Sequence, residues 1–563
     1  MDNQLNAKLI LESYSEIREV NILKPDTLIF HLLEKEFLLF LIPNDSVGLC
    51  PFFLINVNEE IDCPHILLKS VDFSSITEIQ DKKYRPICLY EEDMNVYSIL
   101  SYEDRLRNSI ERLIELLSLN NIKKEIEYQK EFMFYWNSAS SSKITYEIYL
   151  NDTSHPSRMN LYFNRAIARI VANDVILSDL KARNKSKNLW TPHIENDVYF
   201  IPICDTRDIL PPRNGYSWSS TDIRNIFYAK QIDHITSETF SFVETTIPKT
   251  QNIILVFNMQ SPDFDVTFSL KIKCKYIANR SLLNKILNDI DSVEPLYSTR
   301  KDYLYLNKLI GNDIHLSNKK ILLVGAGSLG SYVASELVKN GTRTLTIYDD
   351  DSLSSENIFR WAYGQAEFSS IGLNKAMLLA YHLNNLHPEI QAKGVNKNLN
   401  KDSLLREMSS SDMILFTIGS SDAQLHFNRI LKENNCRVPV IFIWLEAGGK
   451  YSHILVVDYK NDGCFECLYT DHNGCPTNNR ATKSANSSLE KNTVRNGCGG
   501  TRVAYGTATL LRTTSVLLEI VRETFENNLH NNTLIDIFQD HTQISDIEFP
   551  LEACNCCGDK KRK

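Results

Sequence analysis

A short apolar run followed by three regularly spaced glycines constrains the fold of this chain more than any other feature. Residues 321–351 read ILLVGAGSLGSYVASELVKNGTRTLTIYDDD. The apolar run predicts a buried strand, and a helix-period pattern follows the glycines. The glycines have the G-x-G-x-x-G spacing that opens nucleotide-binding helices, at Gly325, Gly327 and Gly330.

A second predicted strand, residues 344–348, ends at the acidic Asp349, about twenty residues past the last glycine. Glycines let the backbone turn tightly and approach a phosphate, to which the helix N-terminus presents its N–H groups. An acidic residue at this strand end can bind ribose hydroxyls. The segment therefore predicts a nucleotide site, but it does not distinguish NAD, FAD, SAM and ATP.

Composition narrows the class of protein. A length of 563 residues suggests about three or four domains. No apolar run reaches the roughly twenty residues that span a membrane, and we see no signal peptide, so a cytoplasmic location without membrane contact is expected. A net charge of −9 argues against nucleic-acid binding. The 13 cysteines are then expected to be thiols, metal ligands or nucleophiles rather than disulfides.

The pattern along the chain changes twice. Residues 1–150 contain short apolar runs and an amphipathic helix at 101–119, for which Ser101 is the expected N-cap. Residues 151–305 are predicted to form a mixed α/β linker domain, in which we find no chemical motif. Residues 306–563 alternate strands and helices, with further strands at 413–418 and 439–444, which predicts a parallel, doubly wound sheet.

Charged side chains after the glycine segment favour a triphosphate over NAD. Asn357, Arg360 and Lys375 follow the second strand, and Asp422 follows the strand at 413–418. Hydride transfer needs an apolar slot for nicotinamide, whereas a triphosphate needs cations and an acid that holds a metal. Arg360 and Lys375 can neutralise the leaving pyrophosphate, and Asp422 can bind Mg²⁺.

These elements, in this order, resemble the ThiF/MoeB and ubiquitin-activating adenylation domain across the C-terminal region. The resemblance implies that the three glycines line ATP, that Asp349 binds ribose and that Asp422 binds Mg²⁺. It also implies phosphate contacts from Asn357, Arg360 and Lys375, and adenylation of a protein's C-terminal carboxylate. We interpret Asp350 and Asp351 as turn or helix-cap residues, and Asp351 also matches the family's second acidic position.

Two C-x-x-C pairs near the C-terminus predict a structural metal site. Their four thiolates suit tetrahedral Zn²⁺, and the ligands would be Cys464, Cys467, Cys554 and Cys557. Adenylation domains of the family commonly have such a site. The alternatives are a redox pair or unconnected thiols, and Cys556 is a substitute ligand.

Cys498 is the predicted nucleophile of this region. It precedes two glycines and a helix whose N-terminus would lower the pKa of the thiol. In related activating enzymes, a cysteine on this crossover segment takes the activated carboxylate from AMP as a thioester. A packing cysteine at a tight turn is the structural alternative, and Cys475 in the polar loop 470–496 is the competing nucleophile.

Residues 63–136 resemble the ubiquitin-conjugating fold of bacterial proteins, with Cys88 as the active cysteine. The H-P-N motif and the tryptophan after the cysteine are absent; Tyr97 stands near the place of the latter. This leaves oxyanion stabilisation unassigned. Cys88, between Ile87 and Leu89, is alternatively a buried strand cysteine.

The whole chain resembles the fused activating–conjugating enzyme of bacterial CBASS antiphage systems. That resemblance implies a protein substrate, the C-terminus of a cGAS/DncV-like nucleotidyltransferase, which the enzyme conjugates to a target. It also implies a homodimer formed through the adenylation domain. The alternatives are a ThiF/MoeB-type adenylyltransferase acting on a ubiquitin-like or sulfur-carrier protein, with a separate conjugating partner, and an NAD-sensing module without enzyme activity.

Overall fold

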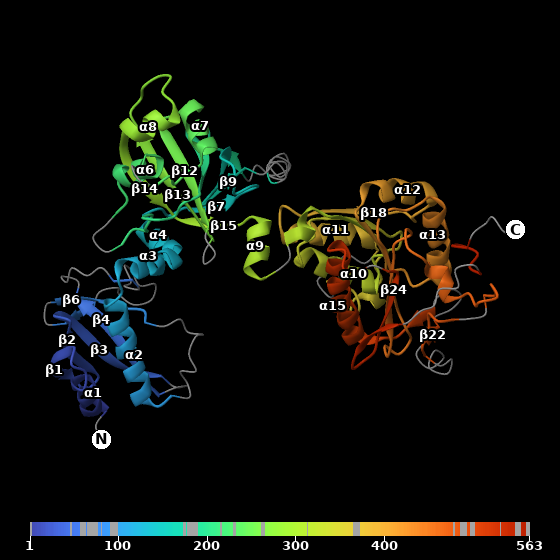
Figure 1. Ribbon diagram of the computed structural model, residues 1–563, viewed down its shortest axis with the longest axis horizontal. Helices are drawn as coiled ribbons and strands as arrows, with labels where there is room; N and C mark the ends of the chain where they lie inside the picture. Colours follow the sequence, from blue (N-terminus) through green and yellow to red (C-terminus); the bar gives the residue numbers. More distant parts are fainter. Residues whose placement is uncertain are drawn as a thin grey trace. The chain divides into compact units, whose positions relative to one another are not determined.

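A computed structural model gives the structure of the chain and divides it into two compact units, Met1–Lys301 and Asp302–Lys563. Each unit is described by itself (Figure 1). The structure describes residues 3–44, 48–56, 63–64, 77–79, 82–89, 100–172, 176, 190–213, 217–228, 232–260, 265–311, 314–363, 372–476, 479–484, 493–495, 501–529, 531–545 and 553–558.

The first unit begins with an antiparallel six-stranded sheet of order β1-β2-β3-β4-β6-β5. Its strands are β1 (Ile17–Lys24), β2 (Thr27–Leu32), β3 (Lys35–Asn44), β4 (Gly48–Asn56), β5 (Thr77–Ile79) and β6 (Lys82–Pro86). Helices α1 (Asn3–Glu12) and α2 (Tyr102–Leu117) pack with it. The predicted N-cap of α2 is confirmed, because the Ser101 side chain accepts the Asp104 N–H at 3.1 Å.

A second, nine-stranded sheet completes the first unit, in the order β14-β13-β12-β11-β8-β9-β7-β15 with β10 beside β8. The strands are β7 (Thr145–Tyr149), β8 (Ser157–Asn164), β9 (Ile167–Val171), β10 (Thr191–Pro192), β11 (Asn196–Ile203), β12 (Asn252–Gln260), β13 (Asp265–Cys274), β14 (Ile290–Leu296) and β15 (Ser298–Arg300). Because β7 belongs to this sheet, the sheet starts inside the region 1–150 and not at residue 151.

Helices α4 (Phe132–Ala139), α6 (Ser220–Phe227), α7 (Ser237–Thr245) and α8 (Leu282–Asn288) pack on the nine-stranded sheet. Helix α3 (Asn121–Lys130) precedes them, and its Gln129 side chain donates to the backbone oxygens of Thr206 and Ile209. Trp136 of α4 is fully buried, and its indole N–H donates to the backbone oxygens of Ser269 and Leu296 at 3.2 and 3.1 Å. This side chain fixes α4 on β13 and β14.

The second unit is built on an eight-stranded sheet of order β18-β17-β16-β19-β20-β21-β24-β25. The first five strands are parallel and the last three antiparallel. The strands are β16 (Lys320–Val324), β17 (Thr344–Tyr348), β18 (Gln391–Val395), β19 (Met413–Phe416), β20 (Val440–Leu445), β21 (Ser452–Val457), β24 (Thr533–Ile537) and β25 (Thr542–Ser545). A hairpin lies beside this sheet, β22 (Thr493–Arg495) with β23 (Thr501–Val503).

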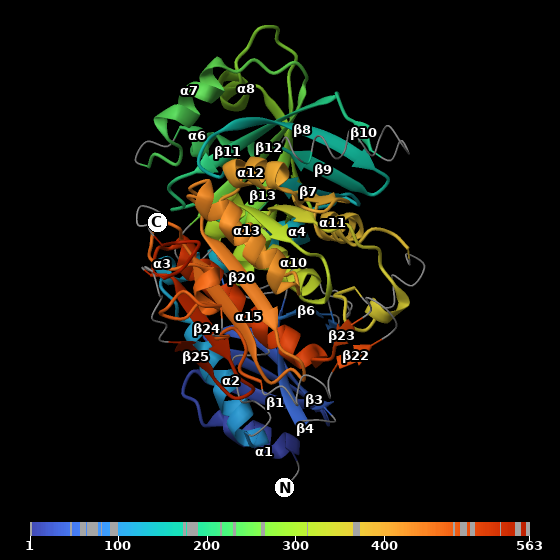
Figure 2. The same cartoon turned by 90° about the vertical axis from the view of Figure 1, so that its right-hand side faces the viewer.

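Helices cover both faces of this sheet, as Figures 1 and 2 show, so the predicted doubly wound fold is confirmed. One face packs against α10 (Ser328–Lys339), α11 (Lys375–Leu386) and α15 (Gly506–Phe525), and the other against α12 (Lys401–Ser410) and α13 (Ser421–Glu433). Successive residues of β16 alternate between the two cores, with Leu323 in one and Leu322 in the other. Such burial on both faces explains why the strand is an unbroken apolar run.

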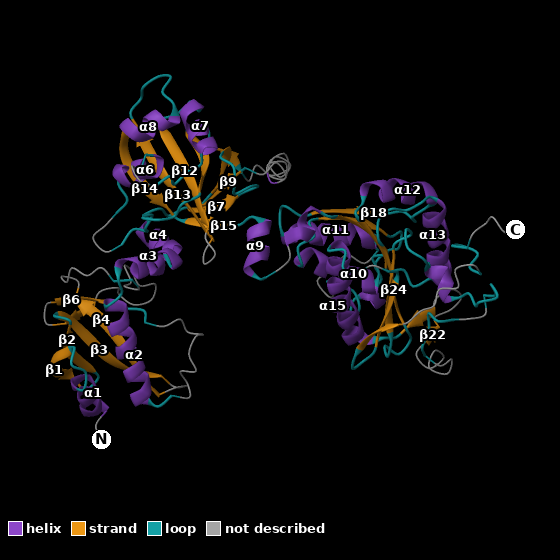
Figure 3. Ribbon diagram, viewed as in Figure 1, coloured by secondary structure: helices purple, strands orange, loops and turns teal. Residues whose placement is uncertain are grey.

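Helix α9 (Tyr303–Leu309) begins the second unit and is fixed by residues of that unit. Asp302 caps it by accepting the Tyr305 N–H at 3.0 Å. Glu389, which is buried just before β18, accepts the Tyr303 N–H at 2.9 Å. The Tyr303 hydroxyl donates to the backbone oxygen of Val338. The secondary structure of both units is coloured in Figure 3. Among the described residues, no helix combines the length and the apolar character needed to cross a membrane.

Candidate functional site

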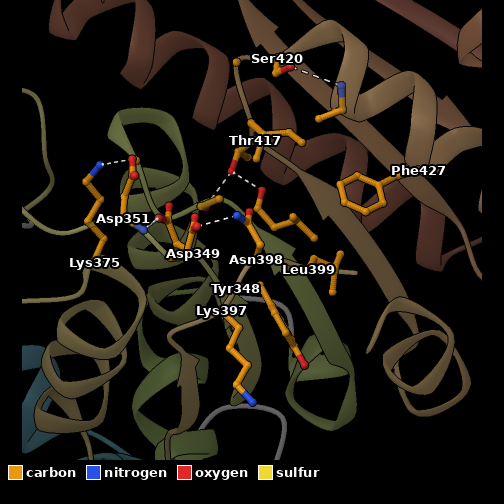
Figure 4. A pocket seen from close by; sticks show the side chains of 17 residues that line it. Tyr348, Asp349, Asp351, Lys375, Lys397, Asn398, Leu399, Thr417, Ser420 and Phe427 are labelled. Atoms are coloured by element: carbon orange, nitrogen blue, oxygen red, sulfur yellow. Dashed lines mark hydrogen bonds and ion pairs between the residues drawn. The ribbon is translucent and has the colours of Figure 1, made fainter. Parts of the chain in front are cut away.

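A cavity of about 390 Å³ opens at the carboxyl ends of the parallel strands. Strand β16 lies between β17 and β19, so the connections diverge from this point to opposite sides of the sheet. In open α/β sheets, ligands bind at such a switch point. Of the residues predicted to bind the nucleotide, Gly325, Gly327, Asp349 and Lys375 line the cavity (Figure 4).

The glycines of the loop between β16 and α10 have three different structural roles. Gly325 has a φ of +104°, which side chains rarely allow. Gly327 is the N-cap of α10, and a Cβ added there would meet no atom within 4 Å, so the first turn of the helix stays open to the cavity. Gly330 does not line the cavity; a Cβ there would come within 2.0 Å of the Gly325 backbone oxygen. It lets the helix approach the strand end.

Asp349 lies at the end of β17 and ties that strand to the glycine loop. One carboxylate oxygen accepts the Ala326 N–H at 2.6 Å, and the other accepts the Asp351 N–H at 2.8 Å. Burial raises the pKa of Asp349 above its usual value, although these N–H groups and the nearby Lys375 oppose the shift. The carboxylate therefore positions the loop as well as facing the cavity.

Lys375 is held by its place at the start of α11. Asn374 caps this helix, and its side-chain amide donates to the backbone oxygens of Asp349 and Asp351 at 2.8 and 3.1 Å. The Lys375 ammonium lies 2.9 Å from the Asp351 carboxylate, as Figure 4 shows. Lys375 is only 8% exposed, whereas the Asp351 side chain is 72% exposed, so the cation is fixed and its partner is open to solvent.

Asn357, Arg360 and Asp422 do not line the cavity. The Asn357 side chain accepts the Ser354 N–H and hydroxyl, which forms a capping box. The Arg360 guanidinium lies over the ring of Tyr505, 5.6 Å from its centre. Asp422 is exposed in the first turn of α13, between the cavity-lining residues Ser420 and Ala423.

Sequence reasoning missed several cavity residues on two other loops. Lys397, Asn398 and Leu399 follow β18, while Thr417 follows β19. Asn398 donates to Asp350 at 2.5 Å, and the Thr417 hydroxyl lies 2.9 Å from the Gly325 backbone oxygen, to which it donates. These residues could have been predicted from their position directly after parallel strands, because the carboxyl ends of parallel strands meet at one edge of the sheet.

The four cysteines of the predicted metal site come together. Their sulfur atoms all lie within 4.8 Å of one another, and three of the residues are buried. The Sγ–Sγ distances include 4.0 Å (Cys464–Cys467), 3.9 Å (Cys464–Cys554) and 3.3 Å (Cys467–Cys557). Tetrahedral Zn²⁺ with bonds of about 2.3 Å requires about 3.8 Å between sulfurs, so this set fits a closed zinc site.

Cys556 has a different partner. The Asn428 side-chain amide donates to its sulfur at 3.3 Å. Asn428 is fully buried, and its oxygen accepts the Tyr459 hydroxyl at 3.0 Å and the Phe465 N–H at 3.2 Å. Asn428 thus joins the two cysteine segments, and Cys556, which also contacts Cys464, is not one of the group of four.

The structure describes two of the three predicted nucleophilic cysteines. Cys498 lies outside the described residues, as does Tyr97. Cys475 is exposed, and its N–H donates to the Asp471 carboxylate at 2.8 Å. Cys88 follows β6 and is exposed, whereas its neighbour Ile87 is 3% exposed. The alternative of a buried strand cysteine at position 88 is therefore wrong.

Comparison with known proteins identifies the class of the second unit. Residues 307–556 match the ThiF family, and this part of the chain is a ThiF family domain. The chain is 27% identical over 233 residues to the ATP-dependent ubiquitin transferase-like protein Cap2 of Pseudomonas aeruginosa, a match that covers 39% of this chain and 40% of that protein. The chain thus spans less than half the length of that relative.

Two further similarities also cover only part of the chain. The sulfur carrier protein ThiS adenylyltransferase of Escherichia coli is 24% identical over 179 residues, which cover 31% of this chain and 69% of that protein. Crystal structures of E. coli MccB, including one with MccA-N7isoASN, align at 17% identity with a TM-score of 0.34, over 43% of this chain and 68% of that one.

Proposed function

We propose that this chain is an ATP-dependent ligase that adenylates the C-terminal carboxylate of a protein and conjugates that protein to a target. The observation that carries the proposal is the cavity, which joins the glycine loop, Asp349 and Lys375 at the carboxyl ends of a ThiF family sheet. The name of the Cap2 relative, a ubiquitin transferase-like protein, supports the conjugating part.

In the first step, a carboxylate oxygen of the substrate attacks the α-phosphorus of ATP, and pyrophosphate leaves. The open N–H groups at the start of α10 and the Lys375 ammonium would bind the phosphate oxygens. Asp349 would accept a ribose hydroxyl. Asp422, at the cavity's edge, would hold Mg²⁺, which neutralises phosphate charge. Asn357 and Arg360 would have to turn toward the phosphates from the contacts described above.

The later steps would move the acyl group between sulfurs. The Cys498 thiolate attacks the carbonyl carbon and AMP leaves; the Cys88 thiolate then attacks the thioester and the Cys498 thiolate leaves. A target amine finally forms an amide, releasing the Cys88 thiolate and a proton. The transfers up to the Cys88 thioester exchange one activated carbonyl for another, and the final amide is more stable than the thioester, so ATP alone supplies the driving force. The exposure of Cys88 supports its role.

For the substrate, we propose the C-terminus of a cGAS/DncV-like nucleotidyltransferase, joined to its target in antiphage defence. A homodimer formed through the ThiF domain and a cytoplasmic location are part of this proposal. The ThiS adenylyltransferase similarity favours one alternative, in which a ubiquitin-like or sulfur-carrier protein is adenylated and a separate partner completes any conjugation.

The test combines ATP–pyrophosphate exchange with trapping of thioesters. Wild-type protein should exchange pyrophosphate only when the substrate polypeptide has a free C-terminal carboxylate, and Arg360→Ala or Asp422→Ala should abolish the exchange. Cys498→Ala should keep exchange but form no reductant-sensitive adduct, because adenylation precedes thiol attack. Cys88→Ala should keep the adduct on Cys498 and stop its transfer to a target.

Peptide mass spectrometry of the adduct separates the alternatives. An adduct on Cys475 would show that the nucleophile is misassigned. Normal conjugation by Cys88→Ala would make the first unit structural and favour the alternative with a separate conjugating partner. Binding of NAD without any ATP-dependent exchange would contradict the adenylation proposal as a whole.

A further inference from the structure

The turn between β20 and β21 contacts the chain on both sides of the crossover segment, residues 485–503. On the first side, the Glu446 carboxylate accepts the backbone N–H groups of Lys483 and Ser484 at 2.6 and 2.8 Å. On the second side, the Gly448 N–H donates to the Ala504 backbone oxygen at 2.7 Å. One turn of the sheet therefore binds both described ends of the segment.

The two contacts are close and specific. Gly449, at a φ of +64°, lies so near the second end that a Cβ would come within 2.2 Å of the Tyr505 backbone oxygen. On the first side, the Trp444 indole of β20 donates to the Ala481 backbone oxygen at 2.8 Å. Residues 481–484 are thus bound by a side chain of the sheet and by the carboxylate that follows it.

A buried histidine sets the position of the Glu446 carboxylate. His453 of β21 is fully buried; its Nε2 lies 2.6 Å from Glu446 and its Nδ1 lies 2.6 Å from Asp536 of β24. Ionised carboxylates only accept hydrogen bonds, so both ring nitrogens must carry protons when both acids are ionised. The ring is then a cation, and the Trp444 ring stacks on it with the centres 4.9 Å apart.

The charges of this cluster balance. Glu446 and Asp536 supply two negative charges, while His453 and Lys483 supply two positive charges, since the Lys483 ammonium lies 3.0 Å from Asp536. Removing the His453 proton would leave a net negative charge in a buried place, which is costly. The protonation state of His453 therefore affects how firmly residues 481–484 are bound to the sheet.

We propose that Glu446, His453 and Asp536 are positioning residues that fix where the crossover segment leaves the second unit, while Gly448 of the same turn binds its other end. They lie away from the nucleotide cavity, so they would act on the acyl transfer and not on adenylation. That functional part rests on the proposed function, which places Cys498 between the two fixed ends. The anchoring of residues 481–484 does not depend on it.

The cluster should also make the anchoring depend on pH. Burial acts to lower the pKa of His453. The hydrogen bonds and charges of Asp536 and Glu446 outweigh this effect and raise the pKa above its usual value of 6.5. A raised folded-state pKa gives stability that is complete below 6.5 and is lost as the pH rises through the raised value. Glu446 contributes to the pH dependence at acidic pH. Burial acts to raise its pKa, but the hydrogen bonds from His453, Lys483 and Ser484 lower it on balance.

The experiment measures hydrogen exchange of the Lys483 and Ser484 amides in the full-length protein, with neither ATP nor substrate. Glu446→Gln should reduce the protection of these amides about tenfold or more, because the acceptor loses its charge. The matched control is Glu389→Gln, which alters another buried carboxylate of the same unit that accepts a backbone N–H away from this segment. Its Lys483 and Ser484 protection should equal wild type.

A second variant covers the case in which Glu446→Gln does not fold. Lys483→Met changes a side chain that is 39% exposed and keeps the backbone N–H, so it should fold and reduce protection by a smaller factor. Wild-type protection of the two amides should also fall as the pH rises through the raised His453 pKa, after correction for the intrinsic exchange rate. Unchanged protection in both variants would overturn the proposal.

Activity then tests the functional part separately. Glu446→Gln should retain pyrophosphate exchange within about twofold while the thioester yield falls about tenfold. Equal losses in exchange and thioester would contradict a role confined to acyl transfer. If wild-type protein shows no exchange at all, the proposed function fails, but the amide protection result stands because it needs no reaction.

Discussion

The nucleotide cavity and the four-cysteine cluster lie in the same unit, but they are built in opposite ways. The cavity is made by strand ends, backbone and a helix start: its glycine loop follows β16, Asp349 follows β17, and Lys375 begins α11. The cysteine cluster joins two segments separated by 90 residues, through side chains and Asn428. The sheet would keep its shape without a nucleotide, whereas the C-terminal cysteine segment would depend on a metal ion that joins it to the other segment.

This difference predicts that substitutions in the two regions separate stability from activity. Changes at the cluster should lower the thermal midpoint first, and changes at the cavity should lower the reaction rate first. Three substitutions test the comparison, in order of their expected effect on stability.

Cys464→Ser should have the largest effect. It removes one of four ligands of the predicted zinc site, and loss of a structural metal typically costs more than about 4 kcal/mol of unfolding free energy. We expect less than one Zn²⁺ per chain by metal analysis and a large fall in the thermal midpoint. Cys556→Ser is the control and should keep the metal, because Cys556 bonds to Asn428. Metal-free wild-type protein with normal stability would contradict the zinc site.

Gly330→Ala should have an intermediate effect. The added Cβ would lie 2.0 Å from the Gly325 backbone oxygen, so α10 and β16 must separate, at a cost of about 1–3 kcal/mol. Thermal unfolding measures the loss, and pyrophosphate exchange should fall with it because the loop moves. Gly327→Ala is the matched control, since no atom lies within 4 Å of its Cβ position. Equal stability of the two variants would show that the close approach is unimportant.

Lys375→Ala should have the smallest effect on stability and a large effect on activity. The ion pair with the exposed Asp351 is worth at most about 1 kcal/mol, so the thermal midpoint should move little. Pyrophosphate exchange should fall about 10²–10³-fold, because the fixed cation no longer stabilises phosphate charge. A variant that loses stability but keeps its exchange rate would reverse the comparison at this residue.

The sequence allowed the fold of the second unit to be predicted because its signals are local. Strand, glycine loop, helix and second strand follow one another within residues 321–351, and the observed β17 is the predicted one at 344–348. Lys397 and Thr417 were missed because their place in the cavity depends on strand order and not on a motif. The contacts of Asn357 and Arg360 were also unpredictable, because they depend on the packing of Ser354 and Tyr505.

The nine-stranded sheet of the first unit was harder to predict, because it is assembled from strands that are distant in the sequence. The parallel pair β11 and β12 and the placement of β7 beside β9 and β15 have no local signature. The helix α2 was predictable, since its apolar spacing and its cap residue Ser101 lie within one segment. The His453 cluster was unpredictable for the same reason, because one of its acids follows β20 and the other lies in the distant strand β24.

The anchoring of α9 has a consequence for how such chains can be assembled. Asp302 caps the helix, and Tyr303 is held by Glu389 and by the backbone near Val338, so the first turn of the second unit is secured from within. A module whose opening helix is secured by its own residues can be joined to different preceding regions without losing its first turn.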